Sequence, residues 1–521
     1  MSVPGPTRPA QQDTATPGGA RRGPRAAIAG IGMCVMLVFG LGASVNLAVG
    51  RLATSALHPT ATQVLWIVDS YLIVFGCLLI PSGAIGDRFG RKGALLCGLA
   101  LMIVGSVGSA VAPSVALLLV ARALTGAGAA LVLPNSLPLL MSCYPQDRRG
   151  HAVALWTALS GGGGVAGNMV GGAVLQFFDW QALFAVAAPL AALGLFVAAK
   201  FLPRVERHHH SVDVRGVFIL VVSVFALLFG IIEGTELGWT SPAVLVAFIA
   251  GLCFLALFIR YEIRREQPLL DPRVFRHPGM RAGTLGIVVS FIAMYSVFYL
   301  NGQYLMNVKD YPAALAGLGT APLAVVIFLV SPRSARLADR YGSRPVVACG
   351  LLVVVVGLGL FSLCGPSTPY VLYAGCIIVV GVGSGLSNPP LSQAVVTSLP
   401  AHQAGVGSGI NSFSREIGGA LGFAVFGTLL NTRFADALPA VLRRFQDDAA
   451  GGQALGSALS SLERSGAAPA DRLSAQVREA FTTGMAESLR VVGVILLLAS
   501  LLVTLWLRRP VSEQNAPREK Q

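Results

Sequence analysis

Charged side chains are scarce in this chain of 521 residues: Asp, Glu, Lys and Arg make up 12%, whereas apolar residues make up 54%. Soluble domains carry about 25% charged residues, because their surfaces must be wetted. The scarcity therefore excludes a string of soluble domains, a disordered chain and a coiled coil. Mean hydropathy is +0.70, and long apolar runs recur from end to end. The composition predicts a polytopic membrane protein.

The chain also lacks the short motifs of several functional classes. Its eight cysteines stand singly in or beside apolar runs, without CxxC pairs, so we interpret them as small buried apolar side chains. This pattern favours neither disulfides nor a metal site. The absence of a GxxxxGK[ST] loop excludes an ATP-driven pump. A membrane enzyme would need a nucleophile–base pair or a metal cluster, and no such group is evident. We therefore expect no enzyme activity and no cofactor.

What the chain does contain is a series of fourteen apolar stretches, each long enough to cross a bilayer. A bilayer core of about 30 Å needs roughly 20 helical residues. The stretches lie near 26–48, 65–85, 93–112, 115–141, 152–175, 182–201, 216–233, 242–259, 282–304, 316–332, 345–364, 370–398, 404–430 and 487–507. The sequence predicts an all-α protein with fourteen transmembrane helices.

Basic residues are distributed unevenly between the loops. If the N-terminus lies in the cytoplasm, 27 Lys and Arg residues fall on the cytoplasmic side, and only Arg51 and Lys309 fall in short outer loops. Cytoplasmic loops of membrane proteins carry such an excess, so both termini are predicted to be cytoplasmic. The net charge of +14 is explained by this topology. We expect no nucleic-acid partner.

Internal repetition divides the chain into two halves. A G-x-G-x-x-L-x-x-P pattern at Gly126 recurs at Gly381, and a D-R-x-G pattern at Asp87 recurs at Asp339. Parallel repeats of this kind are typical of transporters that bind substrate between the halves near the bilayer midplane. The predicted organisation is a tail at 1–25, a six-helix bundle at 26–202, two inserted helices at 203–262, a second six-helix bundle at 263–508 with an outer loop at 431–486, and a tail at 509–521.

The loop after the second span combines glycine, acid and cations. Glycines permit a tight turn, while Asp87 suits a helix N-terminus and the cations suit helix C-terminal ends. Topology alone does not require an acid among these cations, so we predict a gating role for the loop and for its copy in the second half. The residues concerned are Gly83, Asp87, Arg88, Gly90, Arg91, Asp339 and Arg340.

The fifth span is rich in glycine. Gly163, Gly167 and Gly171 are spaced at i, i+4 and i+8, which predicts a bare stripe on which another helix packs closely. Simple packing and a hinge both explain the stripe, and they are compatible. A GxGxxG pattern within it follows no strand, so it does not indicate a dinucleotide site.

Ionisable side chains within spans are costly and therefore point to function or to a paired partner. Arg122 lies midway along an apolar span, and we predict a role in coupling for it together with Asp69; Glu233, Glu236 and Glu416 are the alternative acids. For Arg415 and Glu416 a structural pairing is favoured. A polar cavity and interhelical hydrogen bonding explain a further group equally well. That group comprises Trp66, Asn135, Gln303, Asn388, Gln393 and Asn411.

Several of these segments resemble the motifs of the major facilitator superfamily. Residues 83–92 are similar to its signature A, and residues 119–130 are similar to its signature B. The segments 66–71, 233–239 and 405–419 resemble the fourteen-span drug:proton antiporters of the EmrB/QacA type. The resemblance covers about residues 30–510. It implies a major facilitator fold of two six-helix bundles plus two inserted helices, and export of a lipophilic, antibiotic-like molecule driven by the proton gradient.

Two departures from the family pattern bear on the mechanism. Asn168 stands where the antiporter signature has proline, which weakens the case for antiport and for a helix kink. The first span has no acid between Ile31 and Val45, where related exporters carry one that holds cationic drugs. This absence favours a neutral or anionic substrate.

A proton-coupled importer of a small nutrient on the same fold is the alternative, although fourteen spans and the glycine stripe favour export. The protein is expected in the bacterial cytoplasmic membrane, acting as a monomer. Its expected partners are the lipid bilayer, protons and a small lipophilic substrate.

Overall fold

The computed structural model describes residues 23–53, 55–203, 213–265, 268–438 and 470–507. Within these ranges the chain forms fourteen helices of 19 residues or more, as predicted. They are α1 (Gly23–Ser44), α3 (Ala61–Phe89), α4 (Arg91–Ala110), α5 (Val115–Ser142), α6 (Arg149–Phe177), α7 (Gln181–Phe201), α8 (Val214–Glu236), α9 (Pro242–Glu262), α10 (Pro278–Gln303), α12 (Ala321–Tyr341), α13 (Ser343–Phe361), α14 (Tyr370–Thr397), α15 (Ala404–Ala437) and α18 (Ala470–Trp506).

Seven short elements connect these helices. They are η1 (Val45–Ala48), α2 (Val49–Ala53), η2 (Gln146–Arg148), η3 (Pro272–Arg276), the π-helical turn η4 (Tyr304–Val308), α11 (Ala313–Leu318) and η5 (Ala401–Gln403). Among the described residues, twelve helices are long and apolar enough to cross a membrane. The two long helices outside this set, α6 and α15, contain the glycine-rich stretch and the Arg415–Glu416 pair. Glycine and polar side chains lower their hydropathy without shortening them.

The expected outer loop at 431–486 is partly helical. Helix α15 continues to Ala437 and α18 begins at Ala470, well before the apolar stretch at 487–507. The extensions are stabilised by apolar contacts, since the rings of Phe434 and Phe481 meet edge to face with centroids 6.1 Å apart. Most of the remaining loop, and most of both expected tails, lies outside the described residues.

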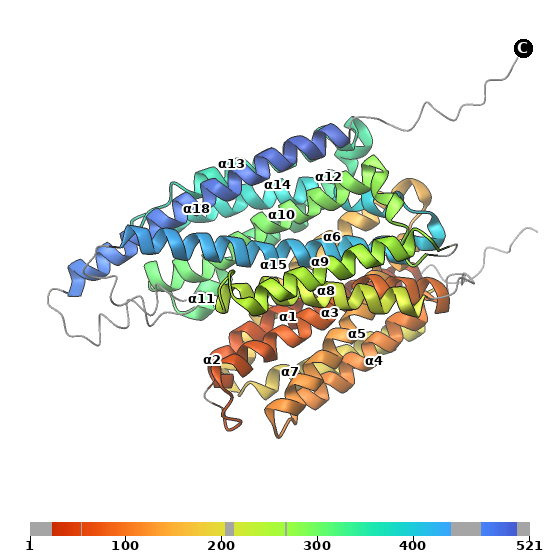
Figure 1. Ribbon diagram of the computed structural model, residues 1–521, viewed down its shortest axis with the longest axis horizontal. Coiled ribbons are helices and arrows are strands. Elements are labelled where there is room, and N and C mark those ends of the chain that lie inside the picture. Colours follow the sequence, from red (N-terminus) through yellow and green to blue (C-terminus); the bar gives the residue numbers. More distant parts are fainter. Residues whose placement is uncertain (1–22, 54, 204–212, 266–267, 439–469, 508–521) are drawn as a thin grey trace, which may run out of the picture.

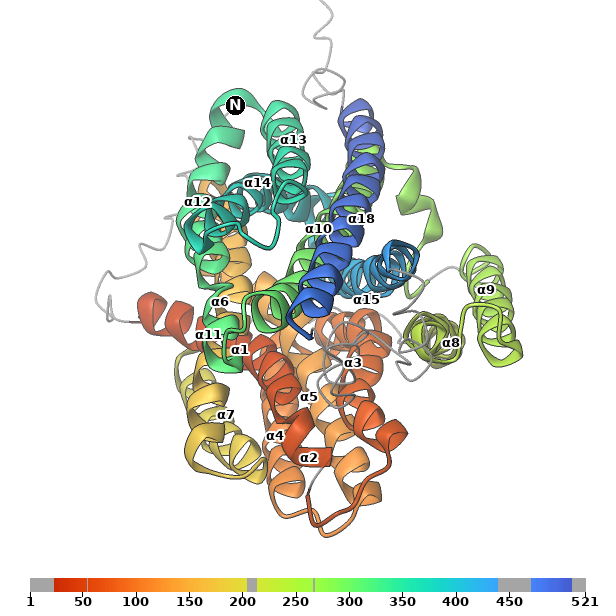
Figure 2. The same cartoon turned by 90° about the vertical axis from the view of Figure 1, so that its left-hand side faces the viewer.

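The long helices form two bundles with separate hydrophobic cores. Helices α1 to α7 make the first bundle and α10 to α18 the second, and these occupy opposite sides of the molecule (Figure 1). The inserted helices α8 and α9 lie at the edge of the two bundles, with α8 next to α3 and α15 and α9 packed on the outer side of α8 (Figure 2). The two bundles correspond to the two predicted six-helix halves.

Helix α8 follows the seam between the halves. On the α3 side, a Cβ atom at Gly76 would lie 2.8 Å from the Leu228 side chain of α8. On the α15 side, Trp239 in the α8–α9 loop donates from Nε1 to the Thr428 hydroxyl at 3.0 Å. Helix α8 and its loop to α9 therefore contact both halves, and the buried side chains of the inserted pair join the core of the second half.

A carboxylate joins the two inserted helices at the end opposite Trp239. Asp213 caps α8 by accepting from the backbone N–H groups of Arg215 and Gly216, both at 3.1 Å. It also accepts from the Tyr261 hydroxyl at 3.1 Å and from Arg265 Nε at 3.2 Å. Burial opposes ionisation of Asp213, but these donors outweigh it, so its pKa is lowered. The ionised group fixes α8 against α9.

Candidate functional site

The loop after α3 docks on the opposite half through Asp87. This carboxylate is 8% exposed and accepts from the backbone N–H groups of Gly405 at 3.0 Å and Val406 at 3.1 Å. Both amides belong to the first turn of α15, where N–H groups have no partner within the helix and the helix dipole favours an anion. Arg91 donates to the same carboxylate at 2.8 Å. The predicted preference of Asp87 for a helix N-terminus is thus met by a helix of the other half.

Glycines allow the two halves to touch at this point. A Cβ atom at Gly405 would lie 2.5 Å from the carbonyl oxygen of Gly83, so only glycine fits. Gly90 ends α3 with a φ of +104°, a conformation that side chains disfavour, and thereby turns the chain into α4. Gly83 and Asp87 contact the other half directly, and Gly90 and Arg91 hold the loop in shape.

The remaining residues of the predicted gate do not take part in this contact. Arg88 lies over the Phe89 ring at 4.9 Å. In the second half, Gly342 repeats the positive φ of Gly90 at +85°, but Asp339 and Arg340 are exposed. The two copies of the loop share their backbone turn, but Asp87 contacts the opposite half whereas Asp339 is exposed.

This difference provides a matched test. We expect Asp87→Asn to lower transport by about tenfold or more, because hydrogen bonds to a charged group contribute roughly 1.5–3 kcal/mol and asparagine offers one neutral acceptor. The repeat-related change, Asp339→Asn, alters an exposed side chain and should leave transport unchanged. Initial transport rates in proteoliposomes measure both. Equal losses in the two variants would contradict the assigned contact.

A second link between the halves is a buried arginine on α15. Arg415 is 2% exposed, and its terminal nitrogens donate to the hydroxyls of Ser160 and Thr157 on α6, both at 3.2 Å. The same guanidinium donates to the Ser392 hydroxyl on α14 at 3.0 Å. It lies 4.7 Å from the centroid of the Trp156 ring. One cation therefore connects the first half with two helices of the second.

The Arg415 guanidinium is hydrogen-bonded to neutral groups, and the neighbouring Glu416 attracts its charge. None of the ion pairs within the described part of the chain includes Arg415, and its Nε has no hydrogen-bond partner there. Its neighbour Glu416 is partly exposed. Burying a charge is costly unless hydrogen bonds and partners compensate for it. Three hydroxyls, an aromatic face and the attraction of Glu416 supply that compensation here.

The other predicted cation, Arg122, lies within the first half. It is 1% exposed, donates from Nε to the Ile67 carbonyl at 3.0 Å, and lies 4.6 Å from the centroid of the Tyr71 ring. One of its terminal nitrogens has no hydrogen-bond partner among the described residues. Asp69, partly exposed on the same stretch of α3, interacts electrostatically with it. The structure thus brings together the acid and the cation that the sequence singled out.

The glycine stripe of the fifth span packs on the first. A Cβ atom at Gly163 would lie 2.7 Å from the Met36 backbone, and one at Gly171 would lie 2.7 Å from the Ser44 side chain. Between them, Gly167 abuts the backbone of Gly40. Helix α6 runs unbroken through Asn168, the residue that replaces the family's proline. Close packing, one of the two interpretations left open, is what the stripe provides here.

Two of the polar residues proposed for a cavity form hydrogen bonds between helices of their own half. Asn135 donates to the Ser82 and Leu131 carbonyls, at 3.2 and 2.8 Å, and Asn388 donates to the Ser290 hydroxyl at 3.2 Å.

The other members of this group have different neighbours. Gln303 accepts from Asn307 at 2.8 Å, and Trp66 packs on Phe229 with ring centroids 6.0 Å apart. Asn411 is fully buried, and Gln393 lies beside Gly150 of the first half. Interhelical hydrogen bonds account for Asn135 and Asn388, whereas the amide of Asn411 has no hydrogen-bond partner among the described residues, and a role of the group in a cavity stays a prediction.

Comparison with known proteins identifies the family. Residues 29–217 and 214–423 match the family model described as Major Facilitator Superfamily. The chain belongs to this superfamily. It is therefore a multi-pass membrane transporter and not an enzyme, which confirms the expected fold class.

Relatives of this major facilitator protein include drug-efflux proteins. The multidrug resistance protein Stp of Mycobacterium tuberculosis is 31% identical over 74% of this chain and 72% of its own length. The multidrug efflux pump LfrA of Mycolicibacterium smegmatis is 30% identical over 87% of this chain and 90% of its own. The human organic anion transporter MFSD10 shares the fold, with a TM-score of 0.59, 15% identity and coverage of 92% and 99% of the two chains.

Proposed function

We propose that this transporter exports a small lipophilic, drug-like molecule across the cytoplasmic membrane in exchange for protons. The observation that carries the proposal is the relationship to Stp and LfrA, which extends over about three quarters or more of the chain. The compounds after which some relatives are named are substrates of those relatives and are not assigned to this chain. What this chain contributes is a buried cation at the seam, a docked signature loop and an acid–cation pair in the first half.

The contact between the halves suggests which side is closed. If the basic loops are cytoplasmic, as their charge favours, then the Asp87 contact with α15 lies at the cytoplasmic end of the seam. The arrangement described here then blocks passage to the cytoplasm. Export requires this contact to break when the substrate enters and to re-form when it leaves.

Proton coupling is assigned to Asp69 and Arg122. The charge of Arg122 attracts the ionised carboxylate of Asp69, and protonation of Asp69 from outside removes that attraction. Release of the proton to the cytoplasm restores it. Because Arg122 also holds the Ile67 carbonyl of α3, a change in the attraction acts directly on the helix that carries Asp87.

Export by Asp69→Asn protein tests this assignment. We expect the purified variant in liposomes to bind substrate but to lose proton-driven export, because the amide has no carboxyl proton to exchange. Asp179→Asn, a change at an exposed outer acid, should export normally. Full proton-coupled export by the Asp69 variant would exclude this residue and direct attention to Glu416, Glu233 and Glu236.

Direction and energy source are tested in cells. In a host without its own pumps, expression should lower the accumulation of sensitive compounds, and a protonophore should abolish the difference. Uptake of a nutrient in the same host would instead favour the importer. Reporter fusions to the C-terminus should indicate the cytoplasm and fusions within 439–469 the outside; the reverse result would contradict the topology.

A further inference from the structure

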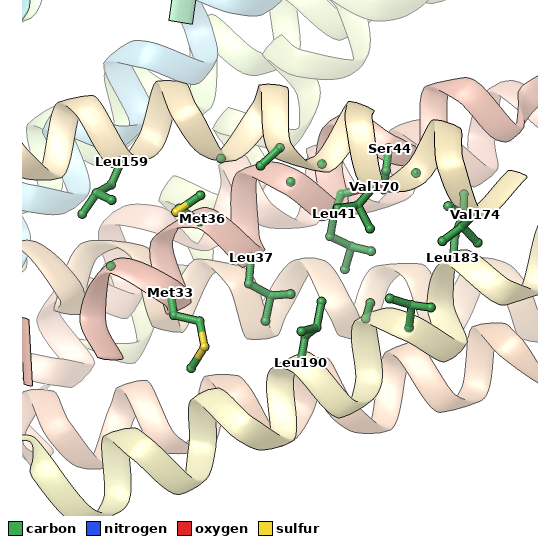
Figure 3. Close-up of a pocket in the computed structure, with 18 of the residues that line it drawn as sticks. Met33, Met36, Leu37, Leu41, Ser44, Leu159, Val170, Val174, Leu183 and Leu190 are labelled. Atoms are coloured by element: carbon green, nitrogen blue, oxygen red, sulfur yellow. Dashed lines mark hydrogen bonds between the residues drawn. The ribbon is translucent and has the colours of Figure 1, made fainter. Parts of the chain in front are cut away.

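The first half carries an apolar groove at a distance from the charged seam. Helix α1 forms its floor, and α6 and α7 form its walls (Figure 3). Its volume is about 450 Å³. Along α1 the lining extends from Ile28 to Ser44, which is roughly 24 Å at 1.5 Å per residue. The groove is long and runs parallel to the helices.

The side chains that line the groove offer no free polar group to a ligand. Ser44 provides the lone side-chain hydroxyl of the lining, and that hydroxyl donates to the Leu41 carbonyl of its own helix at 3.2 Å. The other lining side chains are aliphatic or methionine, with glycine between them. Such a site favours a long, flexible apolar ligand. It cannot orient a compound with several polar groups, because it offers them no hydrogen-bond partner.

The groove opens sideways, toward the bilayer. On its two walls, Val170 of α6 is 49% exposed and Leu190 of α7 is 41% exposed. In a membrane, acyl chains surround this face and run parallel to the helices. One leaflet provides about half of the 30 Å core, so the groove accommodates the full length of a chain.

Cations flank one end of the groove. Arg25 precedes Ile28 and Ala29 by three and four residues on α1, so all three share one face of the helix. Lys200 lies in the last turn of α7, ten residues beyond Leu190, and its ammonium group lies 5.8 and 5.4 Å from the centroids of the Phe196 and Phe201 rings. The two helix ends are adjacent, because a Cβ atom at Gly30 would lie 2.7 Å from the Val197 side chain. Both cations are exposed, at the level where helices leave the hydrocarbon.

We propose that this groove binds one acyl chain of an anionic phospholipid, with the headgroup phosphate between Arg25 and Lys200. The chain lies against the tight crossing of α1 and α6, since Gly40, Gly163 and Gly167 line the same space. The lipid fills the volume that the crossing leaves open. The proposal is independent of the exported substrate and of the proton site.

Photolabelling in vesicles tests the proposal. Full-length protein is reconstituted in phosphatidylcholine containing a minor fraction of phosphatidylglycerol with a photoreactive acyl chain, and labelled peptides are mapped by mass spectrometry. We expect labels on α1, α6 and α7 at the groove. Leu190→Trp should block them, whereas Leu193→Trp, an exposed leucine (50%) that lies outside the lining, should not. Equal labelling of the two tryptophan variants would overturn the assignment.

The headgroup is tested separately. A cation near a membrane surface contributes about fivefold to the binding of an anionic lipid, so Arg25→Gln with Lys200→Gln should remove most of the preference for phosphatidylglycerol over a phosphatidylcholine probe. Equal labelling by both probes in the unchanged protein would exclude an anionic lipid. Labelling that an exported compound displaces, but that excess unlabelled phosphatidylglycerol does not, would identify the groove as a substrate site and overturn the lipid proposal.

Discussion

The Arg415→Ala variant is expected to lose transport completely. Alanine removes three hydrogen bonds, two of which connect α15 to α6 across the seam between the halves. It also removes the donor that Thr157 and Ser392 accept from, and a buried hydroxyl left unpaired costs about 1–3 kcal/mol. The two halves then lose the hydrogen bonds between α15 and α6, which can form only in one relative position of the halves. Initial export rates in proteoliposomes measure the effect.

Two further variants separate this role from a general need for positive charge. Arg415→Lys keeps the charge, but a single ammonium group cannot reproduce the planar fork that reaches two helices, so little transport should return. Arg333→Ala removes an exposed arginine that donates to the Leu329 carbonyl of its own helix, and it should transport normally. If Arg415→Ala transports at the rate of the unchanged protein, the hydroxyl contacts have no part in the transport cycle.

The Gly167→Val variant is expected not to fold into a stable bundle. A side chain at Gly167 would overlap the backbone of Gly40, and neither helix can move without disturbing its other contacts. Overpacking among side chains costs about 1–3 kcal/mol, and a collision with backbone costs more. The yield of monodisperse protein and its thermal unfolding temperature report the loss.

The adjacent stretch of α6 supplies the control. Gly164 has open space where its Cβ atom would lie, so Gly164→Val introduces the same β-branched residue into the same helix without a collision. Its unfolding temperature should stay close to that of the unchanged protein. Similar losses in both variants would mean that helix propensity, and not the contact with α1, makes the stripe intolerant.

Local patterns in the sequence predicted most of the architecture. Fourteen apolar stretches, the turn at Gly90 and the bare stripe on α6 follow from composition and spacing within a few turns of helix. Distant partners could not be predicted in this way. The partner of Asp87 is an amide more than 300 residues away, and the hydroxyl partners of Arg415 lie on α6 and α14.

Other features depended on tertiary packing that the sequence does not record. Thr157 and Ser160 share a face of α6, yet nothing in their spacing identifies an arginine opposite them. The sulfurs of Cys364 and Cys376 lie 3.9 Å apart, so these two cysteines are not isolated. The sequence predicts buried cysteine side chains, but three of them are exposed, namely Cys97, Cys253 and Cys349. The helical extensions around Phe434 and Phe481 are amphipathic, so they fell below the hydropathy of a span.

The chemistry of the Asp87 contact determines how the two sides of the seam tolerate variation. Because α15 offers backbone amides, any residue other than proline at position 406 supplies the same donor. Position 405 must be glycine, since a Cβ atom there would collide with the backbone of Gly83. Asp87 has no comparable freedom, because the contact requires its carboxylate. On the α15 side the contact therefore restricts position 405 to glycine and excludes only proline at position 406, whereas on the α3 side it requires the carboxylate of Asp87.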